Sequence, residues 1–204
     1  MILDWRPVES DNKLIARPEE PLQNEHDKQK FGEALADFSL AAIHGGTSSL
    51  SQRLEGKKAG VVLFWSGVCS HCERYDNYLN EFEQRHPELA LIPVASRHGE
   101  TPEMIHKTMS DRKLTFPLLY DPGSVVARQW FTQQTPRVFL MDAQRKLLYR
   151  GAIDNYKYPD DPEYVAYLEP AIEAYLKGQP QRRQETASYG CAIFSVYYIL
   201  PKAL

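Results

Sequence analysis

Two cysteines, Cys69 and Cys72, are separated by two residues and follow an apolar run at residues 61–65. The run predicts a buried strand, and the apolar positions after Cys72 recur at helical spacing, which predicts a helix. The first thiol would then lie at the helix N-terminus, where unpaired N–H groups and the helix dipole favour a thiolate. Two thiols at this spacing can also close a small disulfide ring. The pair therefore indicates reversible thiol–disulfide chemistry.

Metal binding is one alternative for these cysteines, and a pair of buried, unreactive thiols is another. A structural zinc ion normally takes four ligands. The candidate ligands are Cys69, His71, Cys72 and the distant Cys191. No second clustered pair of ligands accompanies them. We therefore expect no metal ion and no other cofactor.

The composition excludes several classes of function. The 204 residues suffice for one domain with a sizeable core, and 43% hydrophobic with 25% charged residues is ordinary for a globular protein. The net charge is -3, from 24 basic and 27 acidic residues, with no long basic run. This balance argues against nucleic-acid binding and against a polybasic membrane-binding surface.

No stretch of the sequence approaches the roughly 20 apolar residues of a membrane-spanning helix. The best candidate, residues 192–200, is too short and contains Ser195. Residues 1–6 lack the basic start and apolar core of a signal peptide, so we expect a cytoplasmic protein. If a leader has been removed from the sequence, the protein is instead expected outside the cytoplasm. The oligomeric state stays open.

Three segments are expected along the chain. Residues 1–30 are polar and contain three prolines, which predicts an extended N-terminal arm. Residues 31–178 alternate between predicted strands and helices and form the domain. Residues 179–204 form a C-terminal tail that contains Cys191. Predicted strands lie at residues 36–40, 60–65, 89–95, 116–120, 138–141 and 146–150, and predicted helices follow Cys72 and begin at Thr101 and near Asp160. Such alternation predicts an α/β fold with a central mixed β-sheet flanked by helices.

Four stretches in this order resemble the redoxin branch of the thioredoxin-like fold, which includes AhpC/TSA peroxiredoxin-like proteins and TlpA- or ResA-like thiol-disulfide oxidoreductases. They are residues 36–40 with 50–57, Phe64-Trp65 with Cys69-Ser70-His71-Cys72, Thr135-Pro136-Arg137-Val138, and the hairpin end at residues 149–154 with the last helix and the late Gly190-Cys191-Ala192-Ile193. Together they extend over about residues 31–193. The resemblance implies a thioredoxin-like domain with a redox-active CxxC motif.

The resemblance also assigns roles. Cys69 would attack a substrate disulfide, and Cys72 would resolve the mixed disulfide. Pro136 is expected to be cis and to present the Thr135 backbone to an extended substrate strand. His71, in its protonated form, would stabilise the Cys69 thiolate. The implied partners are a thiol- or disulfide-containing protein and an electron donor or acceptor.

The chain departs from thioredoxin at several positions. Leu63 replaces a buried Asp, so proton transfer is expected either to be absent or to be carried out by another group, such as Glu73 or a water molecule. Ser70-His71 replaces Gly-Pro, and a stabilised thiolate at Cys69 would raise the reduction potential above the roughly -270 mV of thioredoxin.

Two other functions stay open. Peroxiredoxins carry a proline where Val62 stands, which disfavours a thiol peroxidase with Cys69 as its peroxidatic cysteine. A redox-sensing or metal-binding module without turnover is the other alternative. Cys191 is a possible extra thiol that resolves or relays a disulfide, pairs with another chain, or has no redox role.

Overall fold

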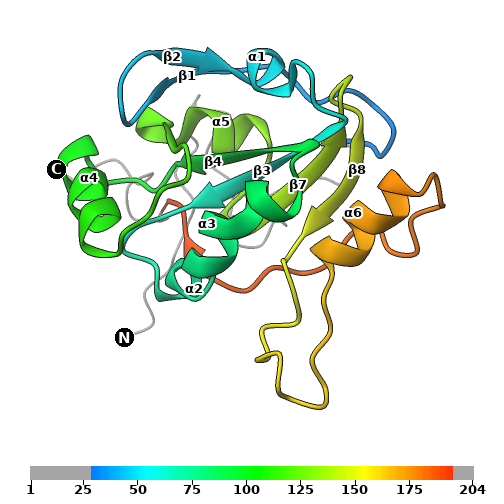
Figure 1. The fold of residues 1–204 in the computed structure, drawn as a ribbon. Coiled ribbons are helices and arrows are strands. Elements are labelled where there is room, and N and C mark those ends of the chain that lie inside the picture. The colour runs from blue at the N-terminus through cyan, green and yellow to red at the C-terminus, as the bar shows by residue number, and fades with distance from the viewer. Residues whose placement is uncertain (1–28, 195–204) are drawn as a thin grey trace, which may run out of the picture.

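A computed structural model describes residues 29–194, which form a seven-stranded sheet with helices against it, and a separate two-stranded sheet (Figure 1). The strands are β1 (Ser39–Ala42), β2 (Thr47–Ser49), β3 (Ala59–Trp65), β4 (Leu89–Ala95), β5 (Leu119–Tyr120), β6 (Gln134–Thr135), β7 (Arg137–Asp142), β8 (Leu147–Gly151) and β9 (Cys191–Ala192). The helices are α1 (Leu50–Leu54), α2 (Ser70–Glu73), α3 (Asp76–Arg85), α4 (Pro102–Asp111), α5 (Val125–Gln129) and α6 (Leu168–Leu176), with a 3-10 turn, η2 (Pro122–Ser124).

The sheet is mixed, as expected. Its strand order is β2-β1-β5-β4-β3-β7-β8, and β6 pairs with β9 in the second sheet. Strand β3 runs parallel to β4 and antiparallel to β7. Every residue of β3 and β4 is buried, which is the pattern of strands covered on both faces. The α/β architecture with a central mixed sheet is therefore confirmed.

Alternate residues of β3 enter two cores on opposite faces of the sheet. Val61, Leu63 and Trp65 pack with residues of α3, α4 and α6. Val62 and Phe64 pack with residues of α1 and α5. Successive side chains of a strand point to opposite faces of the sheet, and because β3 is entirely apolar, both of its faces contribute to a core. The two cores hold the carboxyl end of β3 rigidly, and the loop with Cys69 begins there.

The last helix begins later than the sequence predicts. We expect a start near Asp160, whereas α6 begins at Leu168. The backbone N–H groups of Tyr167 and Leu168 both donate to the Ile153 carbonyl oxygen, at 2.9 and 3.0 Å. Because this backbone bonds to the segment after β8, it cannot form helical hydrogen bonds.

Two predicted strands are also corrected. The edge strand expected at residues 36–40 lies at β1, because Asp37 Oδ1 accepts the N–H of Phe38 at 2.9 Å and takes that group out of a strand ladder. The strand expected at residues 116–120 shrinks to β5, because Pro117 has no N–H to donate.

The helix expected after Cys72 is divided. It forms α2 and α3, which break at Arg74 and Tyr75. Tyr75 is buried, and its hydroxyl donates to Asp154 Oδ1 at 2.7 Å. Cys69 therefore caps a single helical turn, so the dipole expected from a long helix is reduced.

The described part of the C-terminal segment lies against the domain. The N–H of Arg150 in β8 donates to the Gln184 carbonyl oxygen at 2.9 Å, and β9 pairs with β6. The expected arm at residues 1–30 falls outside the described residues, apart from its last two positions. Within residues 29–194, no helix has both the length and the apolar character needed to cross a membrane.

Candidate functional site

The loop between β3 and α2 carries Cys69 at the carboxyl end of the central strand. Cys69 is the N-cap of α2, and its carbonyl oxygen accepts the N–H groups of Cys72 at 2.9 Å and Glu73 at 3.2 Å. Gly67 lies in the tight part of this loop. A Cβ atom there would approach Thr108 Oγ1 to 3.0 Å, so any larger residue would require the Thr108 or Trp65 side chain to shift.

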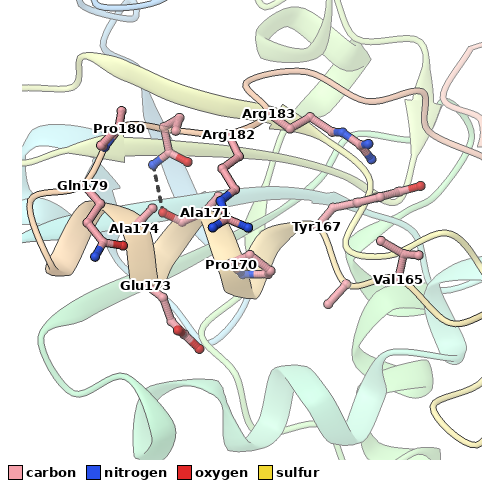
Figure 2. Close-up of a pocket in the computed structure, with 12 residues that line it drawn as sticks. Val165, Tyr167, Pro170, Ala171, Glu173, Ala174, Gln179, Pro180, Arg182 and Arg183 are labelled. Atoms are coloured by element: carbon pink, nitrogen blue, oxygen red, sulfur yellow. Dashed lines mark hydrogen bonds between the residues drawn. The ribbon is translucent and has the colours of Figure 1, made fainter.

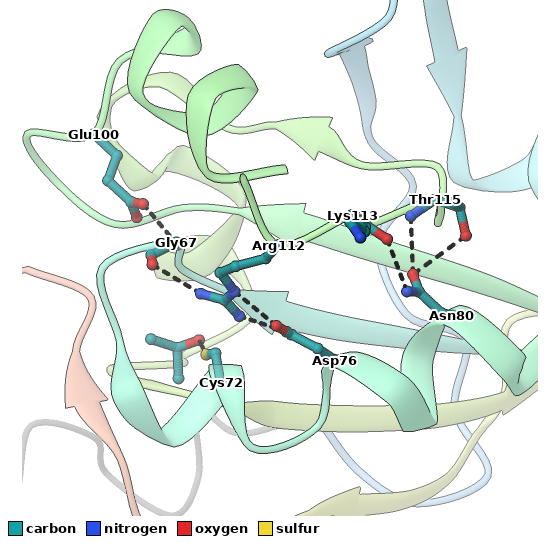
Figure 3. Close-up of polar contacts among 9 residues, drawn as sticks. Gly67, Cys72, Asp76, Asn80, Glu100, Arg112, Lys113 and Thr115 are labelled. Carbon is teal, nitrogen blue, oxygen red and sulfur yellow. Dashed lines mark hydrogen bonds and ion pairs between the residues drawn. The ribbon is translucent and has the colours of Figure 1, made fainter. Parts of the chain in front are cut away.

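Two charged side chains hold this loop in place (Figure 3). The N–H of Gly67 donates to Glu100 Oε1 at 2.7 Å, and Arg112 Nη1 donates to the Gly67 carbonyl oxygen at 3.0 Å. Arg112 also forms a two-pronged ion pair with Asp76, in which Nε lies 2.6 Å from Oδ2. Such forked pairs fix geometry as well as charge. The loop is therefore tied to both α3 and the segment around α4.

Thr135 lies against both sulfurs of the CxxC motif. Its carbonyl oxygen is 3.3 Å from Cys69 Sγ, and its hydroxyl oxygen is 3.1 Å from Cys72 Sγ. The same hydroxyl donates to the Phe64 carbonyl oxygen at 2.6 Å, which anchors Thr135 to β3. The Thr135–Pro136 peptide bond is cis, as the resemblance to redoxins implies. The structure thus brings Cys69, Cys72, Thr135 and Pro136 together.

Cys72 is enclosed in the interior, with 1% of its surface exposed. Burial raises the pKa of the Cys72 thiol to about 12, and the charge of Glu100 acts in the same direction. The Thr135 side chain, the Ser66 backbone and Arg112 act in the opposite direction without offsetting the burial. Cys72 is therefore a protonated thiol at neutral pH.

Cys191 joins the site from the far end of the described chain. It forms a disulfide with Cys69, with Cα atoms 5.9 Å apart and a sequence separation of 122 positions. Cys72 is a free thiol in this state. The disulfide therefore links Cys69 to the C-terminal segment rather than closing the CxxC ring.

His71 faces a cluster of aromatic and cationic side chains. Its ring is half-buried, with its centroid 4.9 Å from that of Tyr156, and the Arg74 guanidinium lies 4.6 Å from the Tyr156 ring. The role of His71 in tuning the Cys69 thiolate stays a prediction.

The buried carboxyl group near the CxxC motif belongs to Glu100. Glu73, which the sequence suggests for proton transfer, is exposed on α2, whereas Glu100 is 4% exposed. Burial raises the pKa of the Glu100 carboxyl. The sequence carries no signal of this burial, because a carboxylate just before the start of a helix is normally solvated.

A hollow of about 570 Å³ lies beside α6, away from this chemistry (Figure 2). Tyr167, Pro170, Arg182 and Arg183 are among the residues that line it, and no cysteine does. Within residues 29–194, no three His, Cys, Asp or Glu side chains gather as a metal site requires. Cys69, Cys72 and Cys191 gather at Thr135, and this cysteine cluster is the candidate redox site.

Relatives of the chain carry names that match this chemistry. It is 27% identical to the thiol-disulfide oxidoreductase ResA of Bacillus cereus over 123 residues, 60% of this chain and 69% of that one. It is 28% identical to ResA of Halalkalibacterium halodurans over 121 residues, 58% of this chain and 66% of that one.

Solved structures share the fold. A hypothetical protein, SMc02350, of Sinorhizobium meliloti has a TM-score of 0.71 at 27% identity, covering 81% of this chain and 94% of that one. The thioredoxin domain of a thiol-disulfide oxidoreductase from Bacteroides vulgatus has a TM-score of 0.53 at 19% identity, covering 60% and 89%. The AhpC/TSA family model matches residues 31–150. With more than half of its length in that match, the chain belongs to the AhpC/TSA family and has the thioredoxin fold.

Proposed function

We propose that Cys69 is the attacking sulfur of a thiol-disulfide oxidoreductase and that Cys72 is its resolving thiol. One observation carries the proposal. Cys69 is bonded to a sulfur from another segment while the free thiol of Cys72 lies in the same site, against the Thr135 hydroxyl. This arrangement resembles the mixed disulfide that exchange chemistry requires.

The reaction proceeds through two exchanges. The Cys69 thiolate attacks one sulfur of a substrate disulfide, so a Cys69–substrate disulfide forms and the other substrate sulfur leaves as a thiolate. The Cys72 thiolate then attacks Cys69 Sγ, which forms the Cys69–Cys72 disulfide and releases the second substrate thiolate. The substrate gains two electrons and the enzyme loses two, and a dithiol donor restores the enzyme.

Thr135 and Pro136 are the proposed substrate-binding residues. The Thr135–Pro136 bond is cis, and the Thr135 carbonyl oxygen lies 3.3 Å from the Cys69 sulfur. A substrate segment beside Cys69 would form backbone hydrogen bonds with β6, as an added strand does.

The named relatives support the class of reaction. Both ResA proteins are thiol-disulfide oxidoreductases by name, and their similarity supports oxidoreductase activity in this chain rather than peroxide reduction or metal binding. The implied partners are a disulfide-containing protein and a thiol donor. The cytoplasmic location stays a prediction.

The experiment is reduction of insulin disulfides by dithiothreitol, followed by the precipitation of the freed insulin chains. The wild-type protein should accelerate it, and Cys69→Ser should lower the rate to that of dithiothreitol alone. A parallel assay of hydrogen peroxide consumption tests the peroxidase alternative. Acceleration of insulin reduction that survives Cys69→Ser, or catalysis of peroxide consumption alone, would contradict the proposal.

A further inference from the structure

Strand β9 occupies the open edge of the site in the way an added strand does. It pairs antiparallel with β6, with Cys191 opposite Thr135 and Ala192 opposite Gln134. Two further backbone bonds extend the contact. The N–H of Ile193 donates to the Gln133 carbonyl oxygen at 2.8 Å, and the N–H of His98 donates to the Ile193 carbonyl oxygen at 2.7 Å.

Side-chain packing fixes the register of β9. Ile193 is 1% exposed and belongs to the core around Val62 and Phe64. A Cβ atom at Gly190 would lie 2.0 Å from the Thr135 carbonyl oxygen, so only glycine permits this approach. The segment is thus shaped to bring Cys191 to Cys69.

A substrate and β9 cannot occupy this edge together. The Thr135 backbone pairs with Cys191, and the Thr135 carbonyl oxygen lies beside Cys69 Sγ. A segment of another protein that brings its sulfur to Cys69 along Thr135 would meet the same backbone groups. Cys191 therefore takes the place of a substrate cysteine and cannot act as resolving thiol while a substrate is bound there.

We propose that the Cys69–Cys191 disulfide is a reversible internal bond that closes the substrate site and that Cys72 opens it. In the opening step the Cys72 thiolate attacks Cys69 Sγ. The Cys69–Cys191 bond breaks, the Cys69–Cys72 bond forms, and Cys191 leaves as a thiolate that takes up a proton. No electrons enter or leave, so both forms are equally oxidised.

The closed form arises by the reverse step. After a substrate disulfide has been reduced, the Cys191 thiolate attacks Cys69 of the Cys69–Cys72 disulfide and Cys72 leaves. This inference rests on the proposed function, which supplies the oxidised CxxC pair. The raised pKa of Cys72 supports the persistence of the closed form, because little of that group is a thiolate at neutral pH.

The test identifies which cysteine is free in the oxidised protein. The reduced wild-type chain is oxidised with one equivalent of diamide, quenched in acid, unfolded, alkylated with N-ethylmaleimide and cut with trypsin. Cys69 and Cys72 fall in the peptide of residues 59–74, and Cys191 falls in that of residues 184–202. The closed form gives these two peptides joined by a disulfide, with the label on Cys72. Label confined to Cys191 would overturn the inference.

A matched pair of variants tests whether the disulfide depends on the pairing of β9 with β6 or whether any added bulk in β9 disrupts it. Gly190→Val adds bulk against Thr135 and should lower the yield of joined peptides at least about tenfold. Ala192→Val adds the same kind of bulk at an exposed position of β9 and should stay within about twofold of the wild-type yield. Equal yields from the two variants would contradict the proposed seating.

The two proposals fail in different ways. If label is confined to Cys191 while insulin reduction still requires Cys69, the internal bond is refuted and the proposed function stands. If insulin reduction proceeds without Cys69, the proposed function fails whatever the labelling shows.

Discussion

Thr135 contacts the sulfurs of both Cys69 and Cys72. Its carbonyl oxygen lies 3.3 Å from Cys69 Sγ, and its hydroxyl oxygen lies 3.1 Å from Cys72 Sγ. The same residue pairs with Cys191 of β9. Thr135 thus contacts the attacking sulfur of Cys69, the thiol of Cys72 and the strand that carries Cys191.

The Thr135 hydroxyl should contribute measurably to stability. Thr135→Val keeps the shape of the side chain but removes its bonds to Phe64 and Cys72, and it should lower the free energy of unfolding by about 1–2 kcal/mol. Thr47→Val, at an exposed position of β2, should change it by less than about 0.5 kcal/mol. Urea unfolding of the reduced proteins measures both. Equal effects at the two positions would show that the hydroxyl bonds contribute nothing.

Arg112 should stabilise the loop that carries Cys69. Arg112→Met removes a half-buried ion pair with Asp76 and a bond to Gly67, so we expect a loss of about 2–3 kcal/mol in the free energy of unfolding. Lys107→Met breaks the exposed pair with Asp111 and should cost less than about 0.5 kcal/mol. The same urea experiment measures the difference. A similar cost for both would mean that the Arg112 contacts do not hold the loop.

The opening of the internal disulfide should accelerate with pH. Because burial raises the pKa of Cys72 to about 12, its thiolate fraction increases about tenfold for each pH unit below that value. Glu100 disfavours this ionisation and Arg112 favours it. The rate at which N-ethylmaleimide labels released Cys191 should therefore rise about tenfold per unit between about pH 7 and 9.

A control variant and a contradicting outcome accompany this measurement. Cys72→Ser, which cannot open the bond, should show no labelling of Cys191 at any pH in this range. A wild-type rate that does not change with pH would mean that Cys72 ionisation does not limit the opening.

A peptide with the sequence of residues 188–194, Ser-Tyr-Gly-Cys-Ala-Ile-Phe, should bind where β9 does. Its thiol should form a mixed disulfide with Cys69 of the oxidised Gly190→Val, Cys191→Ser protein, in which added bulk at position 190 keeps β9 off β6, at least about tenfold faster than the peptide with Val in place of its Gly, since valine meets Thr135. Intact mass over time measures both rates. Equal rates would show that the site does not select glycine before the reacting cysteine.

Local sequence patterns predict the parts of the site that lie close together along the chain. The apolar run ending at Trp65 identifies the central strand, and the two cysteines after it identify the loop. The cis bond at Pro136 follows from a resemblance to redoxins, because most bonds before proline are trans. These features depend on periodicity and on short motifs, which a single sequence displays.

Contacts between distant segments are not visible in such patterns. Nothing local to Cys191 shows that it lies beside Cys69, because the pairing depends on how residues 179–194 fold back along β8 and β6. The burial of Glu100 depends likewise on where α4 packs. Helix α6 begins later than the sequence pattern predicts because backbone bonds to Ile153 compete with helix formation.

The identity of the attacking sulfur is the central claim, and variants that each retain one of the three cysteines test it directly. Each reduced variant is mixed with insulin, and the protein–insulin mixed disulfide is followed by intact mass. The variant that retains Cys69 should form it at least about tenfold faster than those that retain Cys72 or Cys191. Faster formation on Cys72 or Cys191 would contradict the account.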